Sequence, residues 1–135
     1  MVSIQELEKT LQKLSEKEFV SLTFNKAIKE KCLQNKTFYI IGNDYEAAIG
    51  INKLNGEVYS LAENDLVFIN SSLTMLIDFI GTFLQKIDFD EDYIESKRKK
   101  DVKEMVKQLK AMDKKAMREG TWWSLILEQT EDGLL

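Results

Sequence analysis

The stretch TFYIIGNDYEAAIGINKLNGEVYSLAENDLVFIN, residues 37–70, alternates short apolar runs with polar turn residues. Apolar runs of about four to eight residues between Gly, Asn and Asp are typical of β-strands. This pattern predicts strands at 37–42, 46–52, 57–61 and 66–69. Asn55-Gly56 favours the positive φ angles of a type I′ hairpin turn. Because every connection is short, we expect consecutive strands to pair as an antiparallel meander.

The residues that follow the last strand predict a buried helix. Any of Asn70, Ser71 and Ser72 can cap a helix N-terminus. Residues 73–87 are then apolar on most sides, and a helix of that kind is buried. We expect it to lie across one face of the sheet. The predicted fold class is therefore α+β, with a single antiparallel meander sheet flanked by helices.

Helices are also predicted on both sides of this central unit. Ser3 and Glu6 have the S-x-x-E spacing of a capping box, so a helix is expected at 3–14. Gly120 is expected to end a later helix, and Thr121 to cap the last one. The remaining predicted helices cover 25–34, 93–118 and 121–127.

The composition indicates one folded domain and excludes several kinds of active site. The chain is 44% apolar and 31% charged, which is usual for a soluble domain. Its length of 135 residues suffices for one domain, which we expect to span residues 1–135. The chain has no histidine and one cysteine, Cys32. It therefore has no Ser-His-Asp triad, no Cys-His dyad, and no His-ligated or Cys-rich metal site. With no nucleophile and base to pair, we expect no enzyme activity, no cofactor and no metal site.

No targeting or membrane-spanning segment is predicted. The N-terminal residues 1–14 carry charges throughout. The longest uncharged stretch, 66–77, has twelve residues, and a spanning helix needs about 20. One cysteine allows no disulfide within the chain, which fits a reducing compartment. We therefore expect a soluble, cytoplasmic protein without a membrane partner.

The net charge of −4 hides an uneven distribution of charge. Residues 97–118 hold ten Lys or Arg and three acidic residues, a local charge of +7, so the rest of the chain carries −11. A basic helix can follow a phosphate backbone, but this one has few residues suited to reading bases. We therefore interpret it as a solvated helix face whose lysines pair with acidic residues elsewhere, and do not expect nucleic acid as a partner.

The densest acidic cluster is DFDED at 88–92. Its D-x-D-x-D spacing opens a calcium-binding EF-hand loop, but Tyr93 stands where glycine is needed and Lys99 where the bidentate glutamate belongs. Two interpretations stay open. One is a solvated helix start, where carboxylates interact favourably with the helix dipole. The other is an acidic contact surface for a basic partner.

Eight acidic residues at turns and before the long helix are the candidate partner-binding residues. They are Asp44, Glu46, Glu63, Asp65, Asp88, Asp90, Glu91 and Asp92. An acidic surface attracts a basic partner and raises the rate of association. The alternative, that these acids only cap turns and keep the surface soluble, stays open.

Trp122, Trp123 and Cys32 have structural interpretations. Adjacent helix positions point about 100° apart, so we expect one tryptophan in the core and the other near the surface. Cys32 has no histidine partner, so a buried or unreactive thiol is expected.

Several short motifs resemble the SUKH superfamily of bacterial immunity proteins, most closely its fourth subfamily. Three of them are FYIIG at 38–42, AIGIN with NGEVY at 48–59, and FINSSL at 68–73. The closing helix has a similar W-x-x-x-L/I pattern at 122–127. The resemblance covers residues 37–87 best and the C-terminal helix more loosely.

The resemblance implies a SUKH-like fold and a protein without catalytic residues. Members of this superfamily are typically encoded beside polymorphic toxins, often nucleases or deaminases, and protect the producing cell by binding the toxin domain. The implied partner is therefore a cognate toxin domain. We expect the chain itself to be a monomer or weak dimer. The alternative is a non-enzymatic intracellular adaptor or regulatory binding protein of the same fold.

Overall fold

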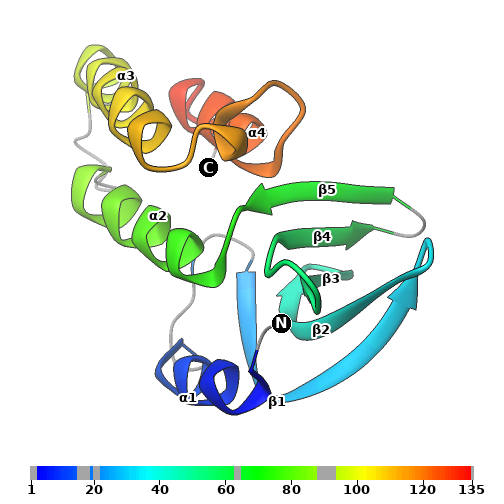
Figure 1. Cartoon of the computed structure of the whole chain (residues 1–135). Coiled ribbons are helices and arrows are strands. Elements are labelled where there is room, and N and C mark those ends of the chain that lie inside the picture. The colour runs from blue at the N-terminus through cyan, green and yellow to red at the C-terminus, as the bar shows by residue number, and fades with distance from the viewer. Residues whose placement is uncertain (1–2, 15–18, 20–21, 63–64, 88–93, 135) are drawn as a thin grey trace.

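The computed structural model describes residues 3–14, 19, 22–62, 65–87 and 94–134. Its centre is a five-stranded antiparallel sheet in the order β1-β2-β3-β4-β5, so every strand pairs with the next one along the chain (Figure 1). The strands are β1 Leu22–Leu33, β2 Lys36–Asp44, β3 Ala47–Asn52, β4 Val58–Ala62 and β5 Asp65–Asn70. The predicted α+β meander is confirmed.

The predicted helix at 25–34 is wrong, because these residues belong to β1, a strand of twelve residues. β1 pairs with β2 through a tight turn at Gln34-Asn35, where both φ angles are positive, at 52° and 62°. Two positive φ angles are the requirement of a type I′ hairpin turn. β1 is an edge strand, and its Lys29 and Lys31 are exposed. Edge strands often carry lysine, which blurs the apolar alternation of a strand.

The connection between β3 and β4 is longer than the predicted type I′ turn. β3 ends at Asn52 and β4 begins at Val58, and of the residues between them only Gly56 has a positive φ, at 79°. The Asn52 side-chain oxygen accepts a hydrogen bond from the Leu54 backbone N–H at 2.8 Å. The Asn52 backbone N–H also donates to the Glu57 carbonyl at 2.8 Å, and the Gly56 N–H donates to the Asn52 carbonyl at 2.9 Å. Side-chain and backbone hydrogen bonds therefore hold this loop together.

The helices are α1 Ile4–Leu14, α2 Leu73–Lys86, α3 Glu95–Met112, the 3-10 turn η1 Lys115–Met117, and α4 Trp122–Glu131. The long helix predicted at 93–118 is therefore shorter than expected. Two predicted caps are confirmed: the Ser72 and Thr121 hydroxyls accept hydrogen bonds from the backbone N–H groups of residues 75 and 124. Gly120 has a φ of 84°, the left-handed conformation that suits glycine before a new helix.

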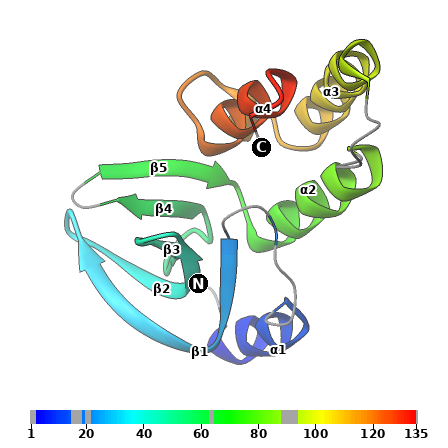
Figure 2. The same ribbon diagram turned by 180° about the vertical axis from the view of Figure 1, so that it is seen from behind.

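The main core lies between the sheet and the helices. α1 packs against β1, α2 and α4 pack against β5, and α3 packs against α2 and α4 (Figures 1 and 2). Phe79 and Phe83 of α2 are fully buried, as predicted for the apolar helix. The ring centroids of Phe79 and Trp123 are 5.4 Å apart, and Phe19 contacts Phe83 at 5.0 Å.

The prediction that only one of the two adjacent tryptophans is buried is wrong. Trp122 is 6% exposed and Trp123 is 0% exposed, and their rings are nearly perpendicular with centroids 5.0 Å apart. Both are buried because α4 is covered on two sides, by α2 and by the sheet end at Asp44. Of the two expectations for Cys32, burial is wrong, because the residue is exposed, with its sulfur 3.6 Å from the Thr37 hydroxyl. That the thiol is unreactive stays a prediction.

A second, smaller apolar cluster lies on the opposite face of the sheet. Tyr59 contacts Phe38 and Phe68 edge to face, with ring centroids 5.9 and 5.5 Å apart. Gly50 leaves room beneath these rings, since a Cβ there would lie 3.0 Å from Phe38 and Leu61. Tyr59 and Phe68 are paired on the neighbouring strands β4 and β5, and such aromatic pairs stabilise the register of a sheet.

Candidate partner-binding surface

The β2–β3 turn lies at the same end of the sheet as the paired residues Ala62 and Asp65. The register pairs Asp44 with Ala47, Ala48 with Leu61, and Ala62 with Asp65. The β2–β3 turn therefore lies beside the end of β4 and the start of β5. With strands about 4.8 Å apart, the backbones of Asp44 and Asp65 are about 14 Å apart across the sheet.

We call this surface, made up of Asp44, Tyr45, Glu46 and Asp65, the sheet end. It contains three of the predicted acidic residues: Asp44, Glu46 and Asp65. Glu46 and Asp65 are exposed, and Asp44 is half-buried. The other five predicted residues lie outside the described part of the chain; they are Glu63, Asp88, Asp90, Glu91 and Asp92. The grouping of the described acids supports a contact surface here.

Asp44 has a structural role besides its charge. Its carboxylate accepts a hydrogen bond from the indole N–H of Trp122 at 2.8 Å. A hydrogen bond to a charged acceptor is stronger than one between neutral groups. Asp44 therefore fastens the end of β2 to α4, and Glu46 and Asp65 are the acids that face the solvent.

Sequence reasoning missed Tyr45, which lies between two of the predicted acids. Its side chain is 83% exposed, the largest value among the exposed large apolar side chains of the described residues. Its φ angle is 53°, in the left-handed region. The signal in the sequence was an aromatic residue in the short polar segment between two predicted strands, where Gly, Asn and Asp are usual.

A groove runs beside β5 from the same end of the sheet. It has a volume of about 300 Å³ and is lined by Leu66, Val67, Phe68, Lys115, Arg118, Glu119, Gly120 and Thr121. Its lining combines apolar residues of β5 with charged residues of both signs. Apolar patches with a polar rim are typical of surfaces that bind another protein.

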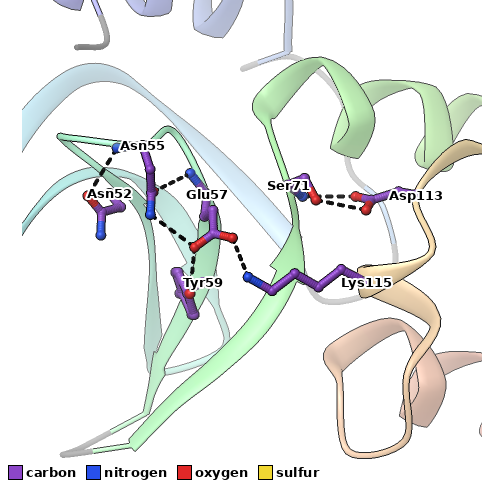
Figure 3. A network of polar contacts seen from close by, with 7 residues as sticks. All are labelled: Asn52, Asn55, Glu57, Tyr59, Ser71, Asp113 and Lys115. Carbon is purple, nitrogen blue, oxygen red and sulfur yellow. Dashed lines mark hydrogen bonds and ion pairs between the residues drawn. The ribbon is translucent and has the colours of Figure 1, made fainter.

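A carboxylate next to this groove is held by three neighbours. Glu57 accepts hydrogen bonds from the Tyr59 hydroxyl and the Asn55 side-chain amide, both at 3.0 Å, and from the Lys115 ammonium (Figure 3). The same ammonium lies 4.6 Å from the centre of the Phe68 ring. These contacts tie η1 to the edge of the sheet.

The electrostatics of this cluster do not suit acid–base catalysis. Partial burial opposes ionisation of Glu57, but hydrogen bonds from Lys115 and Tyr59 and the charge of Lys115 outweigh it and lower the pKa of Glu57. Burial, the hydrogen bond to Glu57 and its negative charge raise the pKa of Tyr59 to about 12. An acid–base catalyst works best when its pKa is near the operating pH. The pKa values of Glu57 and Tyr59 are both shifted away from neutral pH.

A second polar network connects β5 to the C-terminal segment. The buried Asp113 carboxylate accepts hydrogen bonds from the Ser71 backbone N–H and the Ser71 hydroxyl, both at 2.8 Å, and from the Asn70 amide at 3.1 Å (Figure 3 shows Ser71 and Asp113). The Asn70 oxygen in turn accepts from Trp123 at 2.7 Å. The FINSSL motif is therefore a structural junction, in which Asn70 and Ser71 hold the C-terminal segment and Ser72 caps α2.

The comparison with protein families matches this junction and most of the fold around it. The model of the family described as SUKH-4 immunity protein matches residues 12–129. The chain belongs to the SUKH-4 immunity protein family. The resemblance to the fourth SUKH subfamily is thereby confirmed. No curated protein and no solved structure matches the chain.

The basic segment of this SUKH-4 chain only partly behaves as expected. Lys115 pairs with Glu57 of the sheet, in keeping with the interpretation that these lysines meet acids elsewhere. Lys99 instead pairs with Glu95 of its own helix, at 3.2 Å. Glu104, an acidic residue within this segment, forms a salt bridge with Lys86 of α2.

The described residues include neither a metal-binding cluster nor a membrane-spanning helix. No three His, Cys, Asp or Glu side chains among them are grouped as a metal ion requires. No helix among them is both long enough and apolar enough to cross a bilayer.

Proposed function

We propose that this SUKH-4 protein binds and neutralises a cognate polymorphic toxin in the bacterial cytoplasm, as a monomer or weak dimer. The observation that carries the proposal is the family match over residues 12–129. The contacts described above are in keeping with it, because the multiply hydrogen-bonded carboxylates of Glu57 and Asp113 connect parts of the fold. The protein then acts by covering the toxin and not by chemistry.

The toxin that fits best is a basic one, of the nuclease or deaminase type. Proteins that grip nucleic acid do so with Lys and Arg that neutralise phosphates. The exposed Glu46 and Asp65 at the sheet end would attract such a surface and accelerate its capture. The five remaining acids of the candidate set, Glu63, Asp88, Asp90, Glu91 and Asp92, are proposed as further residues that contact the toxin.

The test is co-expression of this chain with the toxic C-terminal domain encoded by the neighbouring gene. We expect the two proteins to co-purify and the cells to survive expression of the toxin. A SUKH-4 protein from a different toxin locus serves as the control and is expected to give neither result. A toxin that kills the cells equally with and without this chain would contradict the proposal. Weak capture of several other proteins, without toxin binding, would instead favour an adaptor.

A further inference from the structure

The backbone at Tyr45 has a conformation that this residue type disfavours. Tyr45 and Glu46 form the two-residue connection between the paired residues Asp44 and Ala47. Tyr45 has a φ of 53°, and Glu46 is not among the residues with positive φ. A positive φ at the first central residue alone is the pattern of a type II′ turn, where glycine is favoured. A bulky residue at that position opposes folding.

The side chain of Tyr45 contributes little to the stability of the fold. With 83% of the residue exposed, the ring contributes little apolar burial. Large apolar side chains elsewhere in the sheet, such as Phe38 and Ile41, are fully buried. An exposed aromatic residue in an unfavourable conformation therefore needs an explanation outside the isolated fold.

The turn that carries Tyr45 is firmly mounted. Asp44 pairs with both Leu22 and Ala47, and its carboxylate is held by Trp122 at 2.8 Å. Trp122 is itself buried and packs against Trp123. Binding through a side chain on a pre-ordered turn loses little conformational entropy, and Tyr has only two side-chain torsions to fix.

We propose that Tyr45 is the anchor of the toxin contact, with its ring inserted into an apolar pocket on a basic surface of the toxin. This inference rests on the proposed function and names the side chain that dominates its binding energy. Tyrosine is enriched among such anchors, and arginine stacks favourably on its ring. Glu46 and Asp65 supply the charge complementary to the basic rim of that pocket.

The surrounding surface is large enough for a specific complex. A standard interface buries about 800 Å² on each partner, a patch about 28 Å across. Asp65, about 14 Å from Asp44 across the sheet, and the groove that begins at Leu66 both fit within that footprint. The anchor, its acidic neighbours and the apolar groove can therefore meet one toxin surface together.

The decisive variant is Tyr45→Gly, because it separates binding from stability. It removes the ring and also places the favoured residue in the turn. We expect the variant to melt at a higher temperature than the wild type and yet to bind the purified toxin domain at least about 30-fold more weakly. Tyr45→Phe keeps the ring and should retain most of the affinity.

Leu54→Ala is the matched control. Leu54 is also a large exposed apolar residue of a sheet turn, with 76% exposure, but lies beyond the other end of β3. The six residues of β3 separate the two turns by about 20 Å. We expect this substitution to leave the affinity for the toxin within about twofold of the wild type.

The possible outcomes separate this inference from the proposed function. If the wild type binds the toxin and Tyr45→Gly binds it equally well, the anchor is wrong and the function stands. If the wild type itself does not bind the toxin, both are overturned. If the wild type dimerises and Tyr45→Gly alone makes it monomeric, the ring serves a second copy of the chain, which overturns the toxin assignment.

Discussion

The indole N–H of Trp122 donates a hydrogen bond to the carboxylate of Asp44, 78 positions earlier in the chain, at 2.8 Å. This bond joins the last helix to the end of the second strand, where the acidic turn begins. It gives one acid of the candidate surface a structural role, next to Tyr45 and Glu46 in the turn between β2 and β3.

The ring cluster between α2 and α4 is expected to dominate the stability of the fold. Phe79→Ala should lower the free energy of unfolding by about 3–5 kcal/mol, because it leaves a cavity beside Trp123. Leu84→Ala in the same helix is the control, since Leu84 is 50% exposed, and it should lower stability by less than about 1 kcal/mol. Urea denaturation measures both. Equal effects of the two substitutions would refute the packing described.

The Asp113 network should be a second sensitive point. Asp113→Ala leaves the Ser71 and Asn70 donors without their acceptor, so the free energy of unfolding should fall by about 3 kcal/mol. Asp78→Ala, which removes an exposed carboxylate of α2, should have an effect within about 0.5 kcal/mol. Thermal and urea denaturation measure both variants. If Asp113→Ala is as stable as the wild type, the junction is dispensable for folding.

How far the sequence predicts the fold depends on where the deciding contacts lie. The four strands at 37–69 and helix α2 were predictable, because their apolar runs and caps are local patterns. β1 was not, because a charged edge strand shows weak alternation and is defined by its pairing with β2. The burial of both tryptophans depends on Asp44 and Asn70, which lie 78 and 53 positions away.

The candidate site was predictable only in part. The acidic residues at the turns are visible in the sequence, and the meander explains why Asp44, Glu46 and Asp65 share one end of the sheet. The exposure and positive φ of Tyr45 are properties of one turn geometry, which no local apolar pattern indicates. The anchor was therefore missed while its acidic neighbours were found.

The Glu57 cluster predicts a pH dependence of stability. A carboxyl group whose pKa is lower in the folded chain stabilises the fold above its unfolded pKa, and this stabilisation is lost as the pH falls through the folded pKa. The pKa of Glu57 is lowered from 4.5, so Glu57→Gln should destabilise the protein by about 1 kcal/mol at neutral pH. Its melting temperature should converge with that of the wild type in acid, below the lowered pKa.

The control for this measurement is Glu46→Gln, which changes an exposed turn carboxylate. We expect its melting temperature to follow the wild type at every pH. If Glu57→Gln stays equally destabilised in acid and at neutral pH, the ion pair with Lys115 is not the source of the stabilisation.

Electrostatic steering can be tested at the sheet end. The double variant Glu46→Gln/Asp65→Asn should associate with the toxin domain about tenfold more slowly at low ionic strength, and the difference should shrink at high salt. Glu8→Gln/Asp78→Asn changes the net charge equally through exposed residues of α1 and α2 and should have little effect. Stopped-flow mixing gives the rates. Equal slowing by both pairs would indicate net charge instead of a defined surface.

The same kinetics test the acids that lie before α3. Neutralising Asp90, Glu91 and Asp92 together should slow association at low salt much more than at high salt. An unchanged association rate in this triple variant would show that these three residues do not steer the toxin. Steering would then be assigned to Glu46 and Asp65 alone.

The most direct test of the central claim is a titration of the toxin's own activity with this protein. The purified toxin domain is mixed with rising amounts of the chain, and the residual activity on its substrate is measured after each addition. We predict that the activity falls to background near an equimolar ratio, as a tight blocking complex requires. Full activity in the presence of a tenfold excess of the chain would contradict the account.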